Sequence, residues 1–301
     1  MKTPLIGAGL TIVYTALISG ADGITKLIAG GYAAPQLYAL SGLIVVVLSV
    51  LCNRHRSQDQ GLRTRVPGAM ALRAGATVIG TICFFYAFRL LPFADVFLFI
   101  GMVPLLAGLM SGPILGEPVR PVAWLALSCG FVGVLCLFPQ GYGGLTAGHL
   151  WAVGAVLTGT FSMVMARYIS RFETNALAQV LYPNAALAVT MALALPFVWQ
   201  PMPIGDLAWV LLYAGLLFTG RWLLVVALRH LAAYAVTPLM NLQFVWMAIL
   251  GAVWFDETLA SGTLLGAAIV IGSGLVLIWD QFAPSQLQWP KPFGQRFRTD
   301  P

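Results

Sequence analysis

The sequence predicts an all-α polytopic membrane protein, with ten transmembrane helices arranged as two inverted five-helix repeats around a central cavity. Of its 301 residues, 59% are hydrophobic and only 9% are charged, and the mean hydropathy is +0.88. Soluble domains carry about 25% charged residues, so this composition excludes a cytosolic enzyme and a disordered chain. The apolar residues form runs near the ~20 residues that a spanning helix needs, whereas outer-membrane strands would alternate over ~10-residue segments.

Ten apolar runs are candidate membrane spans, and most are joined by very short connections such as Pro201-Met202-Pro203. The long polar loop, NRHRSQDQGLRTRV, covers residues 53–66. After Asp280 the chain is rich in proline and basic residues, so we expect this tail to lie at the membrane surface or to be disordered. The candidate spans run approximately over residues 4–29, 33–52, 68–90, 93–115, 121–138, 147–168, 175–199, 205–229, 233–255 and 261–280.

The distribution of lysine and arginine residues predicts how these spans are oriented in the membrane. Placing successive loops on alternate membrane sides puts twelve basic residues on the side of both termini and only Lys26 and Arg89 on the other. Because cytoplasmic loops hold the excess of such residues, the sequence predicts a multi-pass protein of the bacterial inner membrane with both termini in the cytoplasm. This placement accounts for the net charge of +6 without a nucleic-acid partner. We expect the N-terminal segment MKTPLIGAGL to belong to a retained first helix rather than to a signal peptide.

Comparing the chain with itself at an offset of 140 residues indicates an internal repeat, and the alternative is that the matched segments are two similar apolar hairpins. Two of the three glutamates superpose under this shift, and the matched pairs are Ala87/Ala227, Arg89/Arg229, Leu91/Leu231, Val96/Val236, Glu117/Glu257, Gly108/Ala248 and Gly112/Ala252. Each half has five spans, an odd number, so the second half must insert upside down, and inverted repeats place a substrate path at the midplane. We therefore predict a first repeat over 1–140, an inverted second repeat over 141–281 and a basic cytoplasmic tail over 282–301.

Ionisable residues inside spans are functional candidates, because each costs several kcal/mol in the membrane. Asp22 and Lys26 lie four apart on one face of the first span, where they can pair; the alternative is a structural pair near the outer interface. For Arg73, near the start of the third span, snorkelling and a cavity role are both open. Arg221 lies eight residues before Arg229, and its planar guanidinium suits two-point binding of a carboxylate, either on a substrate or on Asp22.

A second group of candidates for substrate binding is uncharged. For each, the alternative is a structural hydrogen bond between helices. Asn241 and Gln243 lie two apart on one predicted helix and cannot both face the same way, so one can face the substrate while the other bonds to a neighbouring helix. The group consists of Tyr14, Thr77, Thr81, Tyr86, Tyr182, Asn184, Asn241, Gln243 and Trp246.

Two segments resemble the ten-helix EamA-type members of the drug/metabolite transporter superfamily: YAFRLLPFADVFLFIGMVPLLAGLMSGPILGEPV (86–119) and VALRHLAAYAVTPLMNLQFVWMAILGAVWFDETL (226–259). The resemblance covers residues 5–280 and implies secondary transport of metabolites, often export of amino acids or related compounds. The tryptophan-glycine signature of the family's first helix is replaced here by SGADGITK (19–26). A narrower resemblance is to exporters of opine-type, pseudopaline-like metallophores, which are amino-acid-derived chelators with several carboxylates.

The sequence contains neither a G-x-x-x-x-G-K-[ST] phosphate loop nor an H-E-x-x-H motif. The four cysteines lie in apolar runs without a CxxC pair, so we expect no metal site, no cofactor and no catalytic residues. An intramembrane enzyme acting on lipids would need His, Asp or Glu clustered at one depth, a pattern the sequence does not show. The spacing of Gly108, Gly112 and Gly116 suits either internal helix packing or a homodimer contact.

These observations together predict a secondary active transporter of the inner membrane, with a small molecule and the lipid bilayer as its partners. We expect it to export a small zwitterionic or carboxylate-bearing metabolite, such as an amino acid or an opine metallophore, by alternating access. Import of a small metabolite is the alternative, because direction depends on the coupling ion and not on topology. A lipid-modifying enzyme is the alternative outside transport.

Overall fold

The computed structural model describes residues 2–55, 62–91, 99–116, 146–230 and 242–254, with a few single positions between and beyond them. The predicted spans 121–138 and 261–280 lie almost entirely outside the described residues, as do Asn241, Glu117 and Glu257. The count of ten spans therefore stays a prediction.

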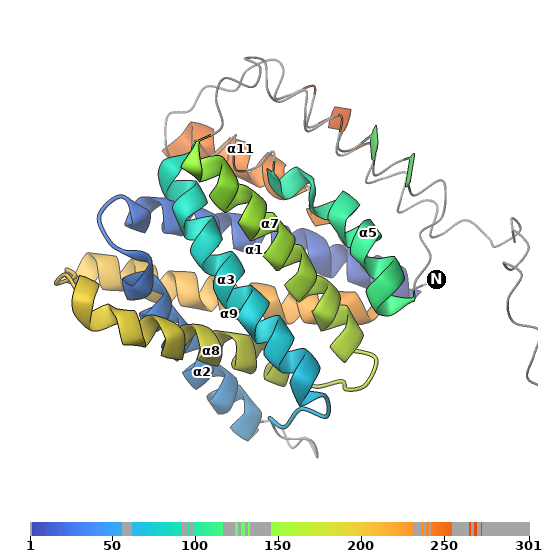
Figure 1. Ribbon diagram of the computed structural model, residues 1–301, viewed down its shortest axis with the longest axis horizontal. Helices are drawn as coiled ribbons and strands as arrows, with labels where there is room; N and C mark the ends of the chain where they lie inside the picture. The colour runs from blue at the N-terminus through green and yellow to red at the C-terminus, as the bar shows by residue number, and fades with distance from the viewer. Residues whose placement is uncertain are drawn as a thin grey trace, which may run out of the picture.

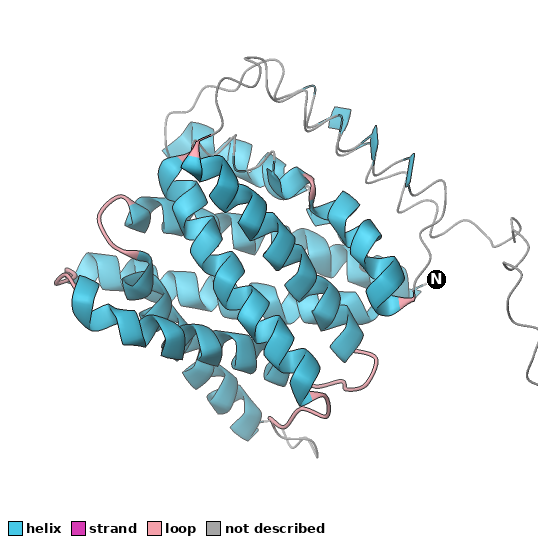
Figure 2. Cartoon of the chain, in the orientation of Figure 1, coloured by secondary structure: helices cyan, strands magenta, loops and turns pink. Residues whose placement is uncertain are grey.

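Eight helices make up the described part of the chain (Figure 1), and no strand occurs within it (Figure 2). Six of the eight are long and apolar enough to cross a membrane, whereas α5 and α11 are shorter. This confirms an all-helical, multi-pass membrane architecture. The helices are α1 (Lys2–Ala29), α2 (Ala34–His55), α3 (Pro67–Leu90), α5 (Val103–Leu115), α7 (Ala147–Ile169), α8 (Ala176–Val198), α9 (Ile204–His230) and α11 (Leu242–Trp254).

Local sequence explains where several helices begin and end. Pro67 occupies the first turn of α3, where its missing N–H costs no hydrogen bond. Asn175 begins α8, and its Oδ1 accepts a hydrogen bond from the backbone N–H of Ala178 at 3.1 Å. Gly116 ends α5 with φ of 62°, a left-handed conformation that glycine adopts without a steric penalty. These signals fall within a few residues of the predicted boundaries.

The long helices pack as three pairs, and each pair joins one helix before residue 140 with one after it. In Figure 1, α3 lies along α7, and the contacts also join α1 with α9 and α2 with α8. At the α2–α8 crossing the helices are so close that a Cβ on Gly42 would lie 3.1 Å from the backbone oxygen of Asn184. The small side chain at Gly42 therefore lets α2 approach the part of α8 that carries a candidate site residue.

Large apolar side chains cover the outside of the bundle. Leu193 and Phe197 on α8 are 73% and 87% exposed, and Leu150 on α7 is 71% exposed. Exposed apolar surface of this extent is what a lipid-facing helix presents. The interior is packed with aromatic rings, including Tyr38 and Phe85, whose centroids lie 5.7 Å apart in an edge-on contact.

Side chains at the end of α7 and in the turn between α7 and α8 form hydrogen bonds to the ends of neighbouring helices. Arg171 donates from Nη1 to the backbone oxygen of Leu115, the last residue of α5, and Arg167 donates in the same way to the backbone oxygen of Leu228 on α9, each at 2.5 Å. Glu173 accepts hydrogen bonds from the Thr64 hydroxyl at 2.9 Å and from a backbone N–H just before α3 at 2.7 Å. Arginines at helix C-termini satisfy carbonyls that have no partner within their own helix.

Candidate functional site

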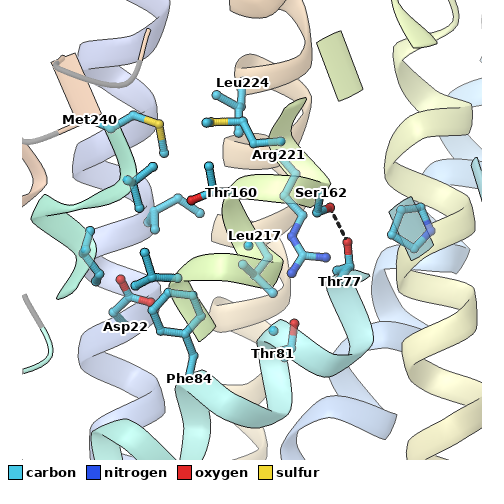
Figure 3. A pocket seen from close by; sticks show the side chains of 18 of the residues that line it. Asp22, Thr77, Thr81, Phe84, Thr160, Ser162, Leu217, Arg221, Leu224 and Met240 are labelled. Atoms are coloured by element: carbon cyan, nitrogen blue, oxygen red, sulfur yellow. Dashed lines mark hydrogen bonds between the residues drawn. The ribbon is translucent and has the colours of Figure 1, made fainter. Parts of the chain in front are cut away.

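A cavity of about 230 Å³ is lined mainly by α1, α3, α7 and α9, with further side chains from α2, α5, α8 and α11. Figure 3 shows side chains of α1, α3, α7 and α9 converging on it. Its walls combine apolar side chains with hydroxyl, amide and charged groups from both halves of the chain. The polar and charged lining residues are Tyr14, Asp22, Thr25, Tyr38, Arg73, Thr77, Thr81, Thr160, Ser162, Gln179, Tyr213, Arg221 and Gln243.

Asp22 is the only carboxylate among the described residues that line the cavity. Its Oδ2 accepts a hydrogen bond from Nε2 of Gln243 on α11 at 2.6 Å. The same two helices are joined by Ser19, whose hydroxyl donates to the backbone oxygen of Gln243 at 3.2 Å, and by Trp246, whose Nε1 donates to Thr15 Oγ1 at 3.2 Å. Asp22 therefore lies at a polar contact between α1 and α11 that joins the two halves.

Arg221 lines the opposite side of the cavity. Its guanidinium points toward Thr77 and Ser162, across the space from Asp22 (Figure 3). Its Nη1 donates to Oδ1 of Asn184 at 2.7 Å, while the Asn184 amide nitrogen donates to the backbone oxygen of Val180 at 2.7 Å. The sequence left open a contact between Arg221 and either a substrate or Asp22. In the structure Arg221 is hydrogen-bonded to the amide of Asn184 rather than to Asp22, and the contact with a substrate stays a prediction.

Arg73 is buried in the cavity wall, with 7% of its surface exposed. Its Nη1 donates to Oε1 of Gln179 at 2.5 Å, and Gln179 in turn donates from Nε2 to the hydroxyl of Ser170 at 3.0 Å. A buried arginine with a partner inside the bundle is not a snorkelling one. One turn further along α3, Thr77 shares a hydrogen bond of 2.7 Å with Ser162.

The structure brings together most of the candidates, but not all. Tyr14, Asp22, Arg73, Thr77, Thr81, Arg221 and Gln243 line the cavity, and Asn184 borders it through Arg221. Lys26 lies one turn beyond Asp22 and is not among the lining residues. Tyr86 stacks on Trp151 with centroids 5.1 Å apart, and Tyr182 and Trp246 are 36% and 37% exposed. The three predicted candidates among these, Tyr86, Tyr182 and Trp246, also lie outside the lining.

Sequence reasoning missed six polar residues that line the cavity: Thr25, Tyr38, Thr160, Ser162, Gln179 and Tyr213. Each is an uncharged polar residue in an apolar run, the kind that usually packs or bonds between helices. One feature of the sequence could have predicted a partner such as Gln179: a buried arginine inside a span needs a hydrogen-bond acceptor. Nothing in the sequence says that Gln179, rather than another amide, faces Arg73.

A charged cavity formed by both halves of a bundle of membrane-spanning helices is the arrangement of a membrane transporter. Residues 6–138 match the model of the EamA-like transporter family, which confirms the resemblance seen in the sequence. This matched range ends close to the boundary predicted for the first repeat.

Two curated relatives are transporters. The chain is 27% identical over 237 residues to a riboflavin transporter of Vibrio cholerae, covering 78% of each protein. It is 27% identical over 205 residues to the pseudopaline exporter CntI of Pseudomonas aeruginosa, covering 65% of this chain and 69% of that protein. A solved crystal structure with 20% sequence identity superposes with a TM-score of 0.71 over 91% of this chain and 98% of its own, and so shares the fold.

Proposed function

We propose that this protein is a secondary active transporter that exports a small zwitterionic or carboxylate-bearing metabolite. The observation that carries the proposal is the pair of opposite charges across the cavity: the Arg221 guanidinium on α9 and the Asp22 carboxylate on α1. A zwitterion presents a carboxylate to the first group and an ammonium to the second. Arginine binds carboxylates with two parallel hydrogen bonds, which gives orientation as well as affinity.

Alternating access follows from ten helices arranged as two inverted repeats, with residues 1–140 and 141–281 rocking about the cavity. The observed helix pairs support this arrangement. A two-fold axis that exchanges the halves maps the first span on the sixth, the second on the seventh and the third on the eighth. This exchange replaces α1 by α7, α2 by α8 and α3 by α9. The α2–α8 pair is therefore mapped onto itself, and the α1–α9 pair is mapped onto the α7–α3 pair; all three pairs are present.

Asp22 is the proposed coupling site for a proton. A carboxylate inside a span carries its charge at high cost, so it gains or loses a proton as its surroundings change. Gln243 stabilises the ionised form by hydrogen bonding. Movement of α11 away from α1 would remove that donor and favour protonation, which links proton uptake to a change in helix packing.

The positive-inside pattern supports a bacterial inner-membrane location with both termini in the cytoplasm. Both named relatives are transporters, and one is an exporter of pseudopaline. We infer that this chain exports an amino acid or an amino-acid-derived compound, including compounds of the opine metallophore type. A riboflavin-like substrate would leave Arg221 and Asp22 without a charged group to bind, so the cavity favours a charged metabolite.

The test compares metabolites in cells and medium for strains with the gene, without it, and with Arg221→Ala. We expect an amino-acid-like or polycarboxylate compound to accumulate inside the deletion strain and to disappear from its medium. Arg221→Ala, expressed at normal levels, should behave like the deletion. Depletion of a compound from the medium only when the gene is present would instead show an importer and would overturn the proposed direction.

A further inference from the structure

We propose that the substrate is an amino dicarboxylate, with one carboxylate bound by Arg73, a second bound by Arg221, and an ammonium group facing Asp22. This inference rests on the proposed function, because it names the substrate class of the same cavity. Three features carry it: the neutral partners of both arginines, a donor on Arg73 without a partner among the described residues, and the spacing of those two partners along α8.

Both arginines are held by amides rather than by carboxylates. Gln179 and Asn184 lie on α8, and each gives its amide nitrogen to another acceptor, namely the Ser170 hydroxyl and the backbone oxygen of Val180. Each amide oxygen is thereby turned toward its arginine. A neutral partner fixes the guanidinium in place without cancelling its charge, whereas a glutamate or aspartate would have neutralised it.

Arg73 retains a donor with no partner among the described residues. Its Nε is buried and unsatisfied, although Nη1 is bound to Gln179. The hydroxyl of Thr160, which also lines the cavity, is buried and unsatisfied as well. Buried polar atoms are nearly always hydrogen-bonded in native proteins, and a bound anion would satisfy the Nε group.

The two guanidinium groups serve different parts of one ligand. Figure 3 places the Arg221 guanidinium beside Thr77 and Ser162. The guanidinium groups of Arg73 and Arg221 bind Gln179 and Asn184, which lie five positions apart on α8, a step of about 7–8 Å along the helix axis. Two anion-binding groups at this separation fit a short diacid, whose carboxylates are separated by a few bonds, better than they fit a single carboxylate.

The charges of the lining residues match such a compound. The described lining holds two arginines and the carboxylate of Asp22, with no lysine, histidine or glutamate. An amino dicarboxylate carries the complementary set of two negative charges and one positive charge. Either an acidic amino acid or an N-carboxyalkyl amino acid has this chemistry.

The test measures binding by isothermal titration to the purified full-length protein in detergent. The probes are L-glutamate, N-(1-carboxyethyl)-L-alanine and, as the matched monocarboxylate, L-glutamine. We expect at least one of the two diacids to bind about tenfold or more tightly than glutamine, because each charged hydrogen-bond pair contributes that much or more. The diacid that binds more tightly shows whether the substrate is an acidic amino acid or an N-carboxyalkyl amino acid.

Two variants test whether Arg73 binds one of the two carboxylates. Arg73→Gln should weaken the better diacid about tenfold, and so should Gln179→Glu, which keeps the arginine but neutralises its charge. The second variant keeps the proposal testable if Arg73→Gln does not fold. Arg89→Gln is the matched control, because Arg89 lies on the same helix, is exposed and does not line the cavity; its affinity should equal that of the wild type.

Three results would each overturn the inference. The diacids could bind no more tightly than glutamine, or neither diacid could bind at all. Alternatively, diacid affinity could be unchanged in folded Arg73→Gln or Gln179→Glu protein. The proposed function fails on a different result. If deletion of the gene changes no charged metabolite in cells or medium, the transport proposal itself is wrong. If glutamine-like compounds are exported while diacids are not preferred, only the dicarboxylate inference is wrong.

Discussion

Arg73 and Arg221 show how a membrane protein can keep charge inside a bundle and leave that charge available for a ligand. Each guanidinium has an amide partner on α8 at 2.5–2.7 Å, which removes part of the cost of burial. Asp22 is held by an amide in the same way. None of these three hydrogen bonds joins two opposite charges, and the orientation of each charged group is fixed before a substrate enters.

Asp22→Asn tests the coupling role of the carboxylate. Asparagine has the same size and still accepts the hydrogen bond from Gln243, but it cannot take up or release a proton. We expect exchange of substrate down its own gradient to continue, while accumulation driven by a proton gradient falls about tenfold or more. Everted membrane vesicles supplied with the compound found in the metabolite comparison measure both activities.

Asp206→Asn is the matched control for that experiment. Asp206 lies in the first turn of α9 and accepts a hydrogen bond from Tyr32 outside the cavity, so proton-driven accumulation should be unaffected. Accumulation at the wild-type level in Asp22→Asn vesicles would rule out Asp22 as the coupling site.

The charged members of the site could be predicted from sequence because charge is so rare in this chain. Asp22, Arg73 and Arg221 stand out in apolar runs, and their cost in lipid makes each a candidate. The amides and hydroxyls could not be sorted in the same way. Gln179 and Tyr182 lie three residues apart on α8, yet only Gln179 lines the cavity, because the rotation of a helix is set by its neighbours and not by its own sequence.

At the level of helices, close approach between α2 and α8 positions Asn184. A Cβ added to Gly42 would lie 3.0 Å from the Cβ of Ala188, 3.1 Å from the backbone oxygen of Asn184 and 3.2 Å from the backbone nitrogen of Ala188. Two of these atoms are backbone and the third is an alanine Cβ, so none of them can move independently of the helix. Helices in membranes depend on such small residues for contact.

We therefore predict that Gly42→Ala destabilises the protein by about 1–3 kcal/mol and lowers its thermal midpoint in detergent by a few degrees. Arg221 should bind substrate less well in this variant, because Asn184 moves with α8. Gly75→Ala is the control, since no atom lies within 4 Å of its added Cβ. Equal midpoints for the two variants would contradict the proposed role of Gly42.

The turn between α1 and α2 is joined to the start of α9 by a pH-sensitive contact. The Tyr32 hydroxyl donates to Oδ2 of Asp206 at 2.5 Å, and this hydrogen bond to a carboxylate is the main cause that raises the pKa of Tyr32 above its usual value. Gln36 and Gln200 reinforce the same junction with two reciprocal hydrogen bonds of 2.5 and 3.1 Å.

Tyr32→Phe should lower the thermal midpoint at neutral pH by a small amount. Because the folded-state pKa is raised, the stabilisation is fully present below the unfolded-state value of about 10. It is lost as the pH rises through the folded-state pKa. The difference in midpoint between wild type and Tyr32→Phe should therefore be constant from about pH 7 to pH 9 and shrink above about pH 10. A difference that persists unchanged at high pH would show that the hydrogen bond is not its source.

At the level of the whole molecule, hydropathy and charge predicted a multi-pass helical bundle, because long apolar segments have few other stable structures in lipid. The bounds of α3 and α7 lie within one or two residues of the predicted spans 68–90 and 147–168. The pairing of helices across the two halves was beyond sequence reasoning, since apolar faces of similar helices are interchangeable in composition. The homodimer contact through Gly108, Gly112 and Gly116 stays a prediction.

The most direct test of the central claim, that this cavity is an alternating-access transport path, is cysteine labelling from the two sides of the membrane. Thr81→Cys in the cavity is introduced into a protein whose four native cysteines are replaced, and Thr190→Cys on the exposed face of α8 is the control. A membrane-impermeant maleimide is applied to right-side-out and to everted vesicles. The account predicts that Thr81→Cys reacts from both sides and Thr190→Cys from neither. Reaction of Thr81→Cys from one side only, or from neither, would contradict it.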